Sequence, residues 1–178
     1  MSTVPASEHQ LRPAPPSDLG PIIRTVIGTA GLTLSALCVI TLGKLLLGLA
    51  PVTAAGRNLA IVLHVASAVP ALPLGAYLLL ASKGTPRHKL LGKVWIALMV
   101  TAAFSALFIR HLNDGNFSWI HILVPVTLLS AWQAVASARA GNIARHKVHL
   151  ARLYLLALIL PGVLAFIPTR LMGFWLFG

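Results

Sequence analysis

The sequence predicts an all-α integral membrane bundle of about five transmembrane helices, with the N-terminus inside. Hydrophobic residues make up 57% of the 178 positions and charged residues only 10%, too few charges for the surface of a soluble domain of this size. Five apolar stretches reach the ~20 helical residues that cross a hydrocarbon layer. Segments rich in Gly, Asn, Pro, Lys and Arg separate them, and such segments are typical of turns.

The five predicted helices follow a short N-terminal tail. Residues 1–20 contain four prolines and no apolar period, so we expect a disordered proline-rich tail followed by one helical membrane domain over residues 21–178. A signal peptide is not expected, because the first apolar run begins after this tail and is long enough to span. The predicted spans cover about residues 22–43, 59–82, 92–112, 118–138 and 148–170.

The distribution of Lys and Arg predicts the orientation of these spans. With the N-terminus inside, ten of the 14 cations fall on the inner side: Arg12, Arg24, Lys83, Arg87, Lys89, Lys93, Arg139, Arg145, Lys147 and Arg152. The other four fall on the outer side: Lys44, Arg57, Arg110 and Arg170. This bias follows the positive-inside rule. The net charge of +11 is therefore attributed to topology and to anionic lipid, and nucleic acid is not an expected partner.

The few acidic residues narrow the chemistry that the spans can perform. Glu8 and Asp18 lie in the tail and Asp114 in an outer loop, so no predicted span contains a carboxylate. This argues against carboxylate-bridged di-iron sites, paired-carboxylate hydrolysis and Asp or Glu proton relays. The single cysteine, Cys38, excludes an internal disulfide and a Cys-rich metal site. Histidine is therefore the remaining candidate for any chemistry in the bundle.

Six of the seven histidines lie near the ends of predicted spans and form two layers. The outer layer holds His64 of span two and His121 of span four, with His111 at a similar level. The inner layer holds His88, which precedes span three, together with His146 and His149 at the start of span five. Neutral imidazoles that meet across a bundle at matched depth are typical of b-type haem ligation, so two layers predict two bis-histidine haem sites.

A small-residue face on span two has two interpretations. Positions 64, 68, 71 and 75 read His64, Ala68, Ala71 and Gly75 and share one helix face. A flat macrocycle could lie against such a face, but small residues at this spacing are equally typical of close packing between membrane helices. Pro70 and Pro73 are expected to kink this helix.

Several cations are candidates to neutralise haem propionates in a chain short of acids. They are Arg57, Arg110 and Arg170 on the outer side and Lys89, Lys93, Arg145 and Arg152 on the inner side. A histidine-ligated copper or zinc site formed by His88, His146 and His149 is an alternative, since His146 and His149 lie on one helix face. A further alternative is a non-enzymatic assembly or accessory subunit of a respiratory complex.

Several motifs resemble a bacterial membrane-protein family, domain of unknown function 2306. They are KGTPRHKLLGKVW, FSWIHIL, ARAGNIARHKVHLARLY and IPTRLMG, together with His64 in an apolar helix, and the similarity covers about residues 25–175. The resemblance implies that the family histidines fall on His64, His88, His121 and His146, with His149 at a variable position. It implies no activity. A looser similarity is to cytochrome b561 proteins, which pair histidines from alternate helices, although the spacings here are shorter.

The favoured hypothesis is a haem b-binding membrane electron-transfer protein, either a membrane oxidoreductase or a redox subunit of a larger complex. Expected partners are the lipid bilayer and quinone or other redox subunits. The compact form and the resemblance favour a multi-pass protein of a bacterial inner membrane.

Overall fold

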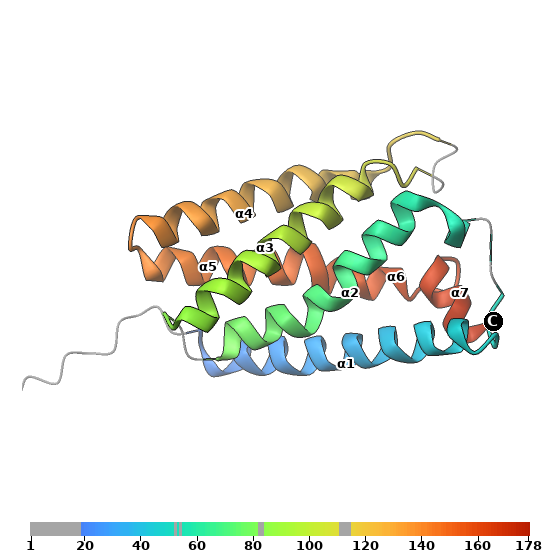
Figure 1. Ribbon diagram of the computed structural model, residues 1–178, viewed down its shortest axis with the longest axis horizontal. Coiled ribbons are helices and arrows are strands. Elements are labelled where there is room, and N and C mark those ends of the chain that lie inside the picture. Colours follow the sequence, from blue (N-terminus) through green and yellow to red (C-terminus); the bar gives the residue numbers. More distant parts are fainter. Residues whose placement is uncertain (1–18, 52, 54, 82–83, 111–114) are drawn as a thin grey trace, which may run out of the picture.

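The computed structural model describes residues 19–51, 53, 55–81, 84–110 and 115–178, and every regular element in this part of the chain is helical (Figure 1). The elements are α1 (Pro21–Leu46), η1 (Ala55–Arg57), α2 (Leu59–Leu80), α3 (Pro86–Ala106), η3 (Trp119–Ile122), α4 (Leu123–Arg139), α5 (Ile143–Tyr154), the π-helical turn η4 (Leu155–Ile159), α6 (Leu160–Ala165) and α7 (Leu171–Phe177). The all-α fold class is confirmed.

Five helical stretches are long and apolar enough to cross a membrane. They are Pro21–Leu46, Leu59–Leu80, Pro86–Ala106, Trp119–Arg139 and Ile143–Ala165. The fourth joins η3 to α4, and the fifth joins α5, η4 and α6. The predicted number of spans is therefore confirmed. The predicted tail over residues 1–20 lies outside the described residues except for Leu19 and Gly20.

The third and fifth spans begin earlier than predicted, because their cationic first turns are helical. The Thr85 hydroxyl accepts the His88 backbone N–H at 3.1 Å, and Pro86 occupies the first turn, where a missing N–H costs nothing. The Asn142 side-chain oxygen accepts the Arg145 backbone N–H at 3.1 Å. Thr85 and Asn142 are therefore the N-caps of α3 and α5. His88 therefore lies inside the first turn of α3 and does not precede it.

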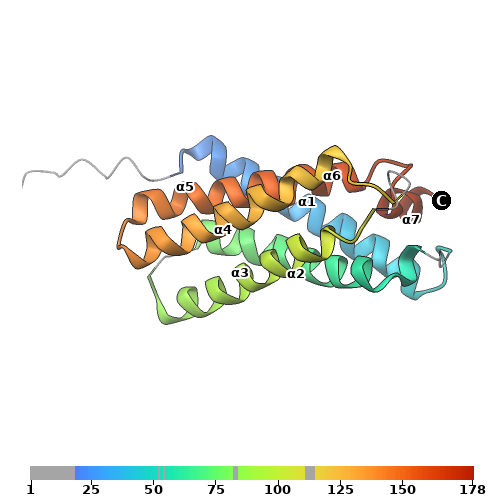
Figure 2. The same ribbon diagram turned by 90° about the horizontal axis from the view of Figure 1, so that it is seen from above.

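Four spans form a ring. α2 packs along α3, α3 against α4, α4 along α5, and α5 returns to α2, while α1 lies outside this ring against α2 and η4. Figures 1 and 2 show this arrangement from two directions. The diagonal pairs, α2 with α4 and α3 with α5, make few contacts with each other. Helices that alternate in direction around a ring place the starts of α2 and α4 at one end and those of α3 and α5 at the other.

The two ends of the bundle differ in charge. One end holds the start of α1, the turn between α2 and α3 and the turn between α4 and α5; we call it the inner end, after the predicted orientation (Figure 1). The opposite, outer end holds α7 and the C-terminus. Eight of the ten predicted inner cations are described and belong to elements of the inner end; Arg12 and Lys83 lie outside the described residues. The separation of the cations into two groups thus holds in three dimensions.

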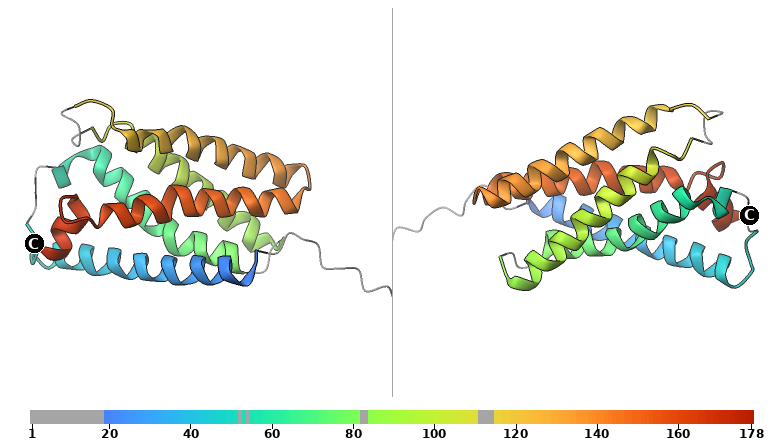
Figure 3. Two further views of the ribbon diagram at one scale, coloured as in Figure 1. Left: turned by 180° about the vertical axis from the view of Figure 1, so that it is seen from behind. Right: turned by 45° about the horizontal axis from the view of Figure 1, so that its top comes forward.

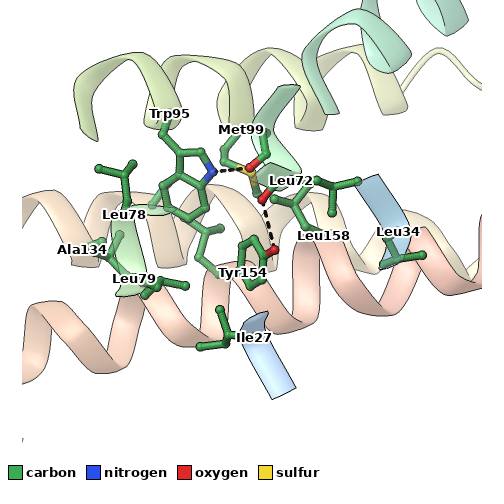
Figure 4. Packing of buried hydrophobic residues seen from close by; sticks show 14 of the residues in the cluster. Ile27, Leu34, Leu72, Leu78, Leu79, Trp95, Met99, Ala134, Tyr154 and Leu158 are labelled. Carbon is green, nitrogen blue, oxygen red and sulfur yellow. Dashed lines mark hydrogen bonds between the residues drawn. The ribbon is translucent and has the colours of Figure 1, made fainter. Parts of the chain in front are cut away.

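The centre of the bundle is tightly packed around two aromatic side chains. Trp95 of α3 and Tyr154 of α5 are 1% and 0% exposed, and their ring centroids lie 6.5 Å apart. Trp95 Nε1 donates a hydrogen bond to the Ala71 carbonyl at 2.9 Å, and the Tyr154 hydroxyl donates to the Leu72 carbonyl at 3.0 Å (Figure 4). Both carbonyls lie between Pro70 and Pro73 of α2. The polar ends of both rings are therefore satisfied inside an apolar core.

Close packing explains the lower part of the small-residue face on α2. A Cβ atom on Gly75 would lie 2.6 Å from Trp95 Nε1 and 2.7 Å from Tyr154 Cδ2. The two aromatic rings thus occupy the space that a side chain at this position would fill. A macrocycle lying on Ala71 and Gly75 would have to displace them. Of the two interpretations of this face, the structure supports the packing of helices.

Candidate functional site

The described histidines lie in two groups at opposite ends of the bundle. His64 is in the second turn of α2 and His121 in η3, so both belong to the outer end. His88 is in the first turn of α3, and His146 and His149 are in the first two turns of α5, at the inner end. The predicted layering is present in the fold. His111, predicted to lie at the outer level, falls outside the described residues.

His64 is held by the neighbouring helix. Its Nδ1 lies 2.9 Å from the Ala102 carbonyl oxygen of α3 and 3.4 Å from the Ser105 hydroxyl. Because a carbonyl oxygen can only accept, Nδ1 must carry the proton, and in the neutral ring Nε2 then keeps its lone pair. No hydrogen bond from another described residue reaches Nε2. Histidines that ligate metals are typically oriented in this way, through the nitrogen that does not bind the ion.

His146 repeats this arrangement at the inner end. Its Nδ1 lies 2.8 Å from the Ala134 carbonyl oxygen of α4, and Ala134 is fully buried. By the same reasoning Nδ1 donates and Nε2 keeps its lone pair. Within the described part of the chain, Nε2 of His146 accepts no hydrogen bond. Two histidines on two helices, at opposite ends of the ring, are therefore fixed in the same tautomer by main-chain carbonyls.

His121 is oriented by its own helical turn. Its Nδ1 accepts a hydrogen bond from the Ser118 backbone N–H at 3.1 Å, and it lies 3.2 Å from the Ser118 hydroxyl and 3.1 Å from the Ser118 carbonyl oxygen. The Phe117 ring packs edge-on against it with centroids 5.0 Å apart, and the Arg110 guanidinium lies 4.2 Å from the centroid of that ring. Nε2 of His121 is buried and has no hydrogen-bond partner among the described residues. A buried, unsatisfied nitrogen of this kind is costly unless a ligand occupies it.

The other inner histidines line the same end. His88 shares the buried face of α3 with Trp95, seven residues further on. Between them on this face lies Gly92, where a Cβ atom would meet no other group within 4 Å. His149 is half-buried, and its Nδ1 is buried without a hydrogen-bond partner in the described chain. The inner end thus offers imidazole nitrogens from both α3 and α5.

Of the predicted propionate partners, Arg110 and Arg170 are half-buried, and the others are exposed at the two ends of the bundle. Arg57 is exposed in η1 at the outer end, while Lys89 and Lys93 of α3 and Arg145 of α5 are exposed at the inner end. None of the four side chains forms a salt bridge with an acidic residue of the described chain, because all three acidic residues fall outside it. These cations are therefore available to an anionic group bound at either end.

The predicted three-histidine copper or zinc site is not assembled. Within residues 19–51, 53, 55–81, 84–110 and 115–178, no group of three or more His, Cys, Asp or Glu side chains could hold one metal ion. At each end, single histidines lie on helices that are diagonally opposite in the ring.

A short C-terminal helix that was not predicted covers the outer end. Met172 and Trp175 of α7 pack into an apolar cluster that includes Val65, the residue after His64. Trp175 Nε1 donates to the Pro51 carbonyl at 3.0 Å, and Lys44 Nζ donates to the Leu176 carbonyl at 2.7 Å. The apolar sequence after Arg170 signals a further helix, but it is too short to span. Its docking depends on contacts between residues far apart in the sequence.

The family model described as a predicted membrane protein, DUF2306, matches residues 61–175, which include all five described histidines. No curated protein and no solved structure matches the chain.

Proposed function

The chain belongs to the DUF2306 family of predicted membrane proteins, and on that premise we propose that it is a haem b-binding electron-transfer protein with two bis-histidine sites. One observation carries this proposal: His64 and His146, at opposite ends of one ring of helices, both donate from Nδ1 to a main-chain carbonyl of a neighbouring helix. Each thereby presents the lone pair of Nε2, which is the form of histidine that binds iron.

The partners at each end follow from the ring. His121 of η3, in the span that α4 continues, lies diagonally opposite the helix of His64. Its buried Nε2 would bind iron in the tautomer whose proton is on Nδ1, where the Ser118 carbonyl oxygen at 3.1 Å can accept it. His88 of α3 lies diagonally opposite the helix of His146, and His149 is the second candidate on α5. Haem b bound by two imidazoles supplies reversible one-electron transfer without an open coordination position.

Other residues would hold the two haem groups and separate them from each other. Arg57 at the outer end, and Lys89, Lys93 and Arg145 at the inner end, are exposed cations suited to pair with propionates. Trp95 and Tyr154 fill the centre between the two histidine layers with apolar contacts and satisfied hydrogen bonds. This packed centre would keep water out of the region between the sites.

The proposal extends to location and partners. Five membrane-spanning helices make this a multi-pass membrane protein in contact with the lipid bilayer. We further propose a bacterial inner membrane, the N-terminus inside, and quinone or another redox subunit as the electron partner. Cations concentrated at one end support this orientation.

An optical spectrum of the purified protein tests the proposal. Protein isolated in mild detergent from haem-replete cells should be red, with a Soret band that shifts on reduction by dithionite. The spectrum of the His64→Ala, His146→Ala double variant should lack this band, while His9→Ala, which removes a histidine of the tail, should retain it. A colourless wild-type protein with stoichiometric copper or zinc would instead favour the metal-ion alternative, and one without any metal an accessory subunit.

A further inference from the structure

One face of the fifth span is cationic at its start and apolar further along. Arg145, His149 and Arg152 are spaced by four and three residues, so they lie on one stripe of α5. The two arginines are exposed and His149 is half-buried. Further along the span, Leu156 and Leu160 are each 44% exposed. The surface therefore begins as cationic at the inner end and continues as apolar toward the outer end.

No acidic residue of the described chain balances the positive charge on this stripe. His149 lies within electrostatic range of both Arg145 and Arg152, and the described part of the chain contains no aspartate or glutamate. The Nδ1 atom of His149 is buried and has no hydrogen-bond partner among the described residues. Like charges held together near a membrane are costly unless an anion compensates them.

The depth of Arg152 suggests where this anion comes from. Arg152 lies nine residues after Ile143, about 14 Å along the helix at 1.5 Å per residue, in a span that continues to Ala165. A long side chain at this depth extends its guanidinium toward the lipid headgroups. The phosphate of a lipid lies at that level, whereas free phosphate in the cytoplasm would have to leave water to reach it.

An apolar groove lies further along the same span. Val163 and Phe166 on one side and Leu34 and Leu37 of α1 on the other are among the residues that line it. Figure 3 (left) shows α5 and α6 between α1 and α4. Val163 is eleven residues beyond Arg152, about 16 Å along the helix, which is close to the length of a lipid acyl chain.

We propose that Arg145, His149 and Arg152 bind the phosphate of an anionic phospholipid, whose acyl chain lies along Leu156 and Leu160 toward the groove between α1 and α6. The surface is complementary to such a lipid in two ways. The positive charges attract the anionic headgroup, and the exposed leucines contact the apolar acyl chain. The lipid site does not rest on the haem proposal, but it uses two residues of that proposal: Arg145, a candidate partner for a propionate, and His149, the second candidate ligand on α5. In the lipid site both side chains bind the phosphate instead.

Native mass spectrometry of the full-length protein in neutral detergent tests this site. Dioleoyl phosphatidylglycerol should bind at least tenfold more tightly than dioleoyl phosphatidylcholine. The Arg145→Gln, Arg152→Gln double variant should lose this preference. The matched control is Lys89→Gln with Lys93→Gln, which removes the same charge from the inner end of α3 and should retain the preference. Millimolar inorganic phosphate should not displace the lipid.

Three outcomes would overturn the proposal. Equal loss of phosphatidylglycerol in both double variants would indicate diffuse charge and not a site on α5. Displacement by inorganic phosphate would indicate a general anion site. Loss of haem with unchanged lipid binding in the arginine variant would assign these side chains to a propionate. The thermal unfolding of each variant, compared with that of the wild type, ensures that lost binding is not lost fold.

Discussion

The outer and inner ends of the bundle carry histidines with similar local geometry in different surroundings. At the outer end, α7 packs against α1, with Trp175 only 3% exposed, and the ring of Phe117 packs edge-on against His121. At the inner end, His88 and His146 lie among exposed cations such as Lys89, Lys93 and Arg145.

The orientation of the histidines and their environment are therefore set by separate parts of the fold. Carbonyls of the ring helices orient His64 and His146 in the same way, while α7 and the cationic turns make the two ends unlike. If both ends bind haem, we expect the inner one to have the higher reduction potential, because positive charge nearby favours the reduced form.

The largest effect is expected in the topology, because each end of the bundle lies on one side of the membrane or on the other. A reporter inserted at Gly84, an exposed turn residue at the inner end, should behave as cytoplasmic. A reporter fused after Gly178 at the outer end should behave as exported, because three spans separate the two points. Alkaline phosphatase and green fluorescent protein fusions at both points make the measurement. Both reporters on one side would contradict the bundle's topology.

The outer end should depend on Trp175. The substitution Trp175→Ala removes a buried indole and its hydrogen bond to Pro51, and we expect α7 to lose docking free energy of about 3–5 kcal/mol. Limited proteolysis should then release the C-terminal residues, while the inner end stays unchanged. Trp132→Ala on α4, where the side chain is 66% exposed, is the matched control and should show the wild-type pattern. Equal resistance of both variants would exclude α7 as a cover of the outer end.

The packed centre should be sensitive to a single methyl group. Gly75→Ala places a Cβ atom against Trp95 and Tyr154, so we expect a loss of about 1–3 kcal/mol in the free energy of unfolding. Gly43→Ala in α1 meets no group within 4 Å and should leave stability unchanged or raise it. Thermal unfolding in detergent compares the two. A Gly75→Ala variant as stable as the wild type would contradict close packing at this position. The small-residue face of α2 would then again be a candidate surface for a bound macrocycle.

The smallest expected effect comes from the two central hydrogen bonds. Tyr154→Phe and Trp95→Phe each remove one donor to the carbonyls of Leu72 and Ala71, and we expect about 1 kcal/mol for the hydrogen bond in Tyr154→Phe. Trp95→Phe should cost more, because it also removes indole volume. Chemical denaturation monitored by circular dichroism measures both. No change in either variant would mean that packing alone holds the centre.

The sequence predicted the elements but not their contacts. Hydropathy and the counts of Lys and Arg were sufficient to predict five spans and two ends of unequal charge. The positions of His64, His88, His121 and His146 were sufficient to predict two layers of histidines. The early starts of α3 and α5 were missed because Thr85 and Asn142 act as N-caps within cationic segments read as turns. The carbonyls that orient His64 and His146 belong to other helices, and the docking of α7 joins residues more than 100 positions apart. Such contacts leave no local pattern in the chain.

Haem stoichiometry in paired variants tests the central claim most directly. Pyridine haemochrome quantification should give two haems per wild-type chain and about one in His64→Ala, His121→Ala, His88→Ala and His146→Ala, with a smaller loss in His149→Ala. Variants of the outer pair should retain the haem of higher potential, and variants of the inner pair the other. Wild-type protein free of haem, or unchanged haem content in both His64→Ala and His146→Ala, would contradict the account.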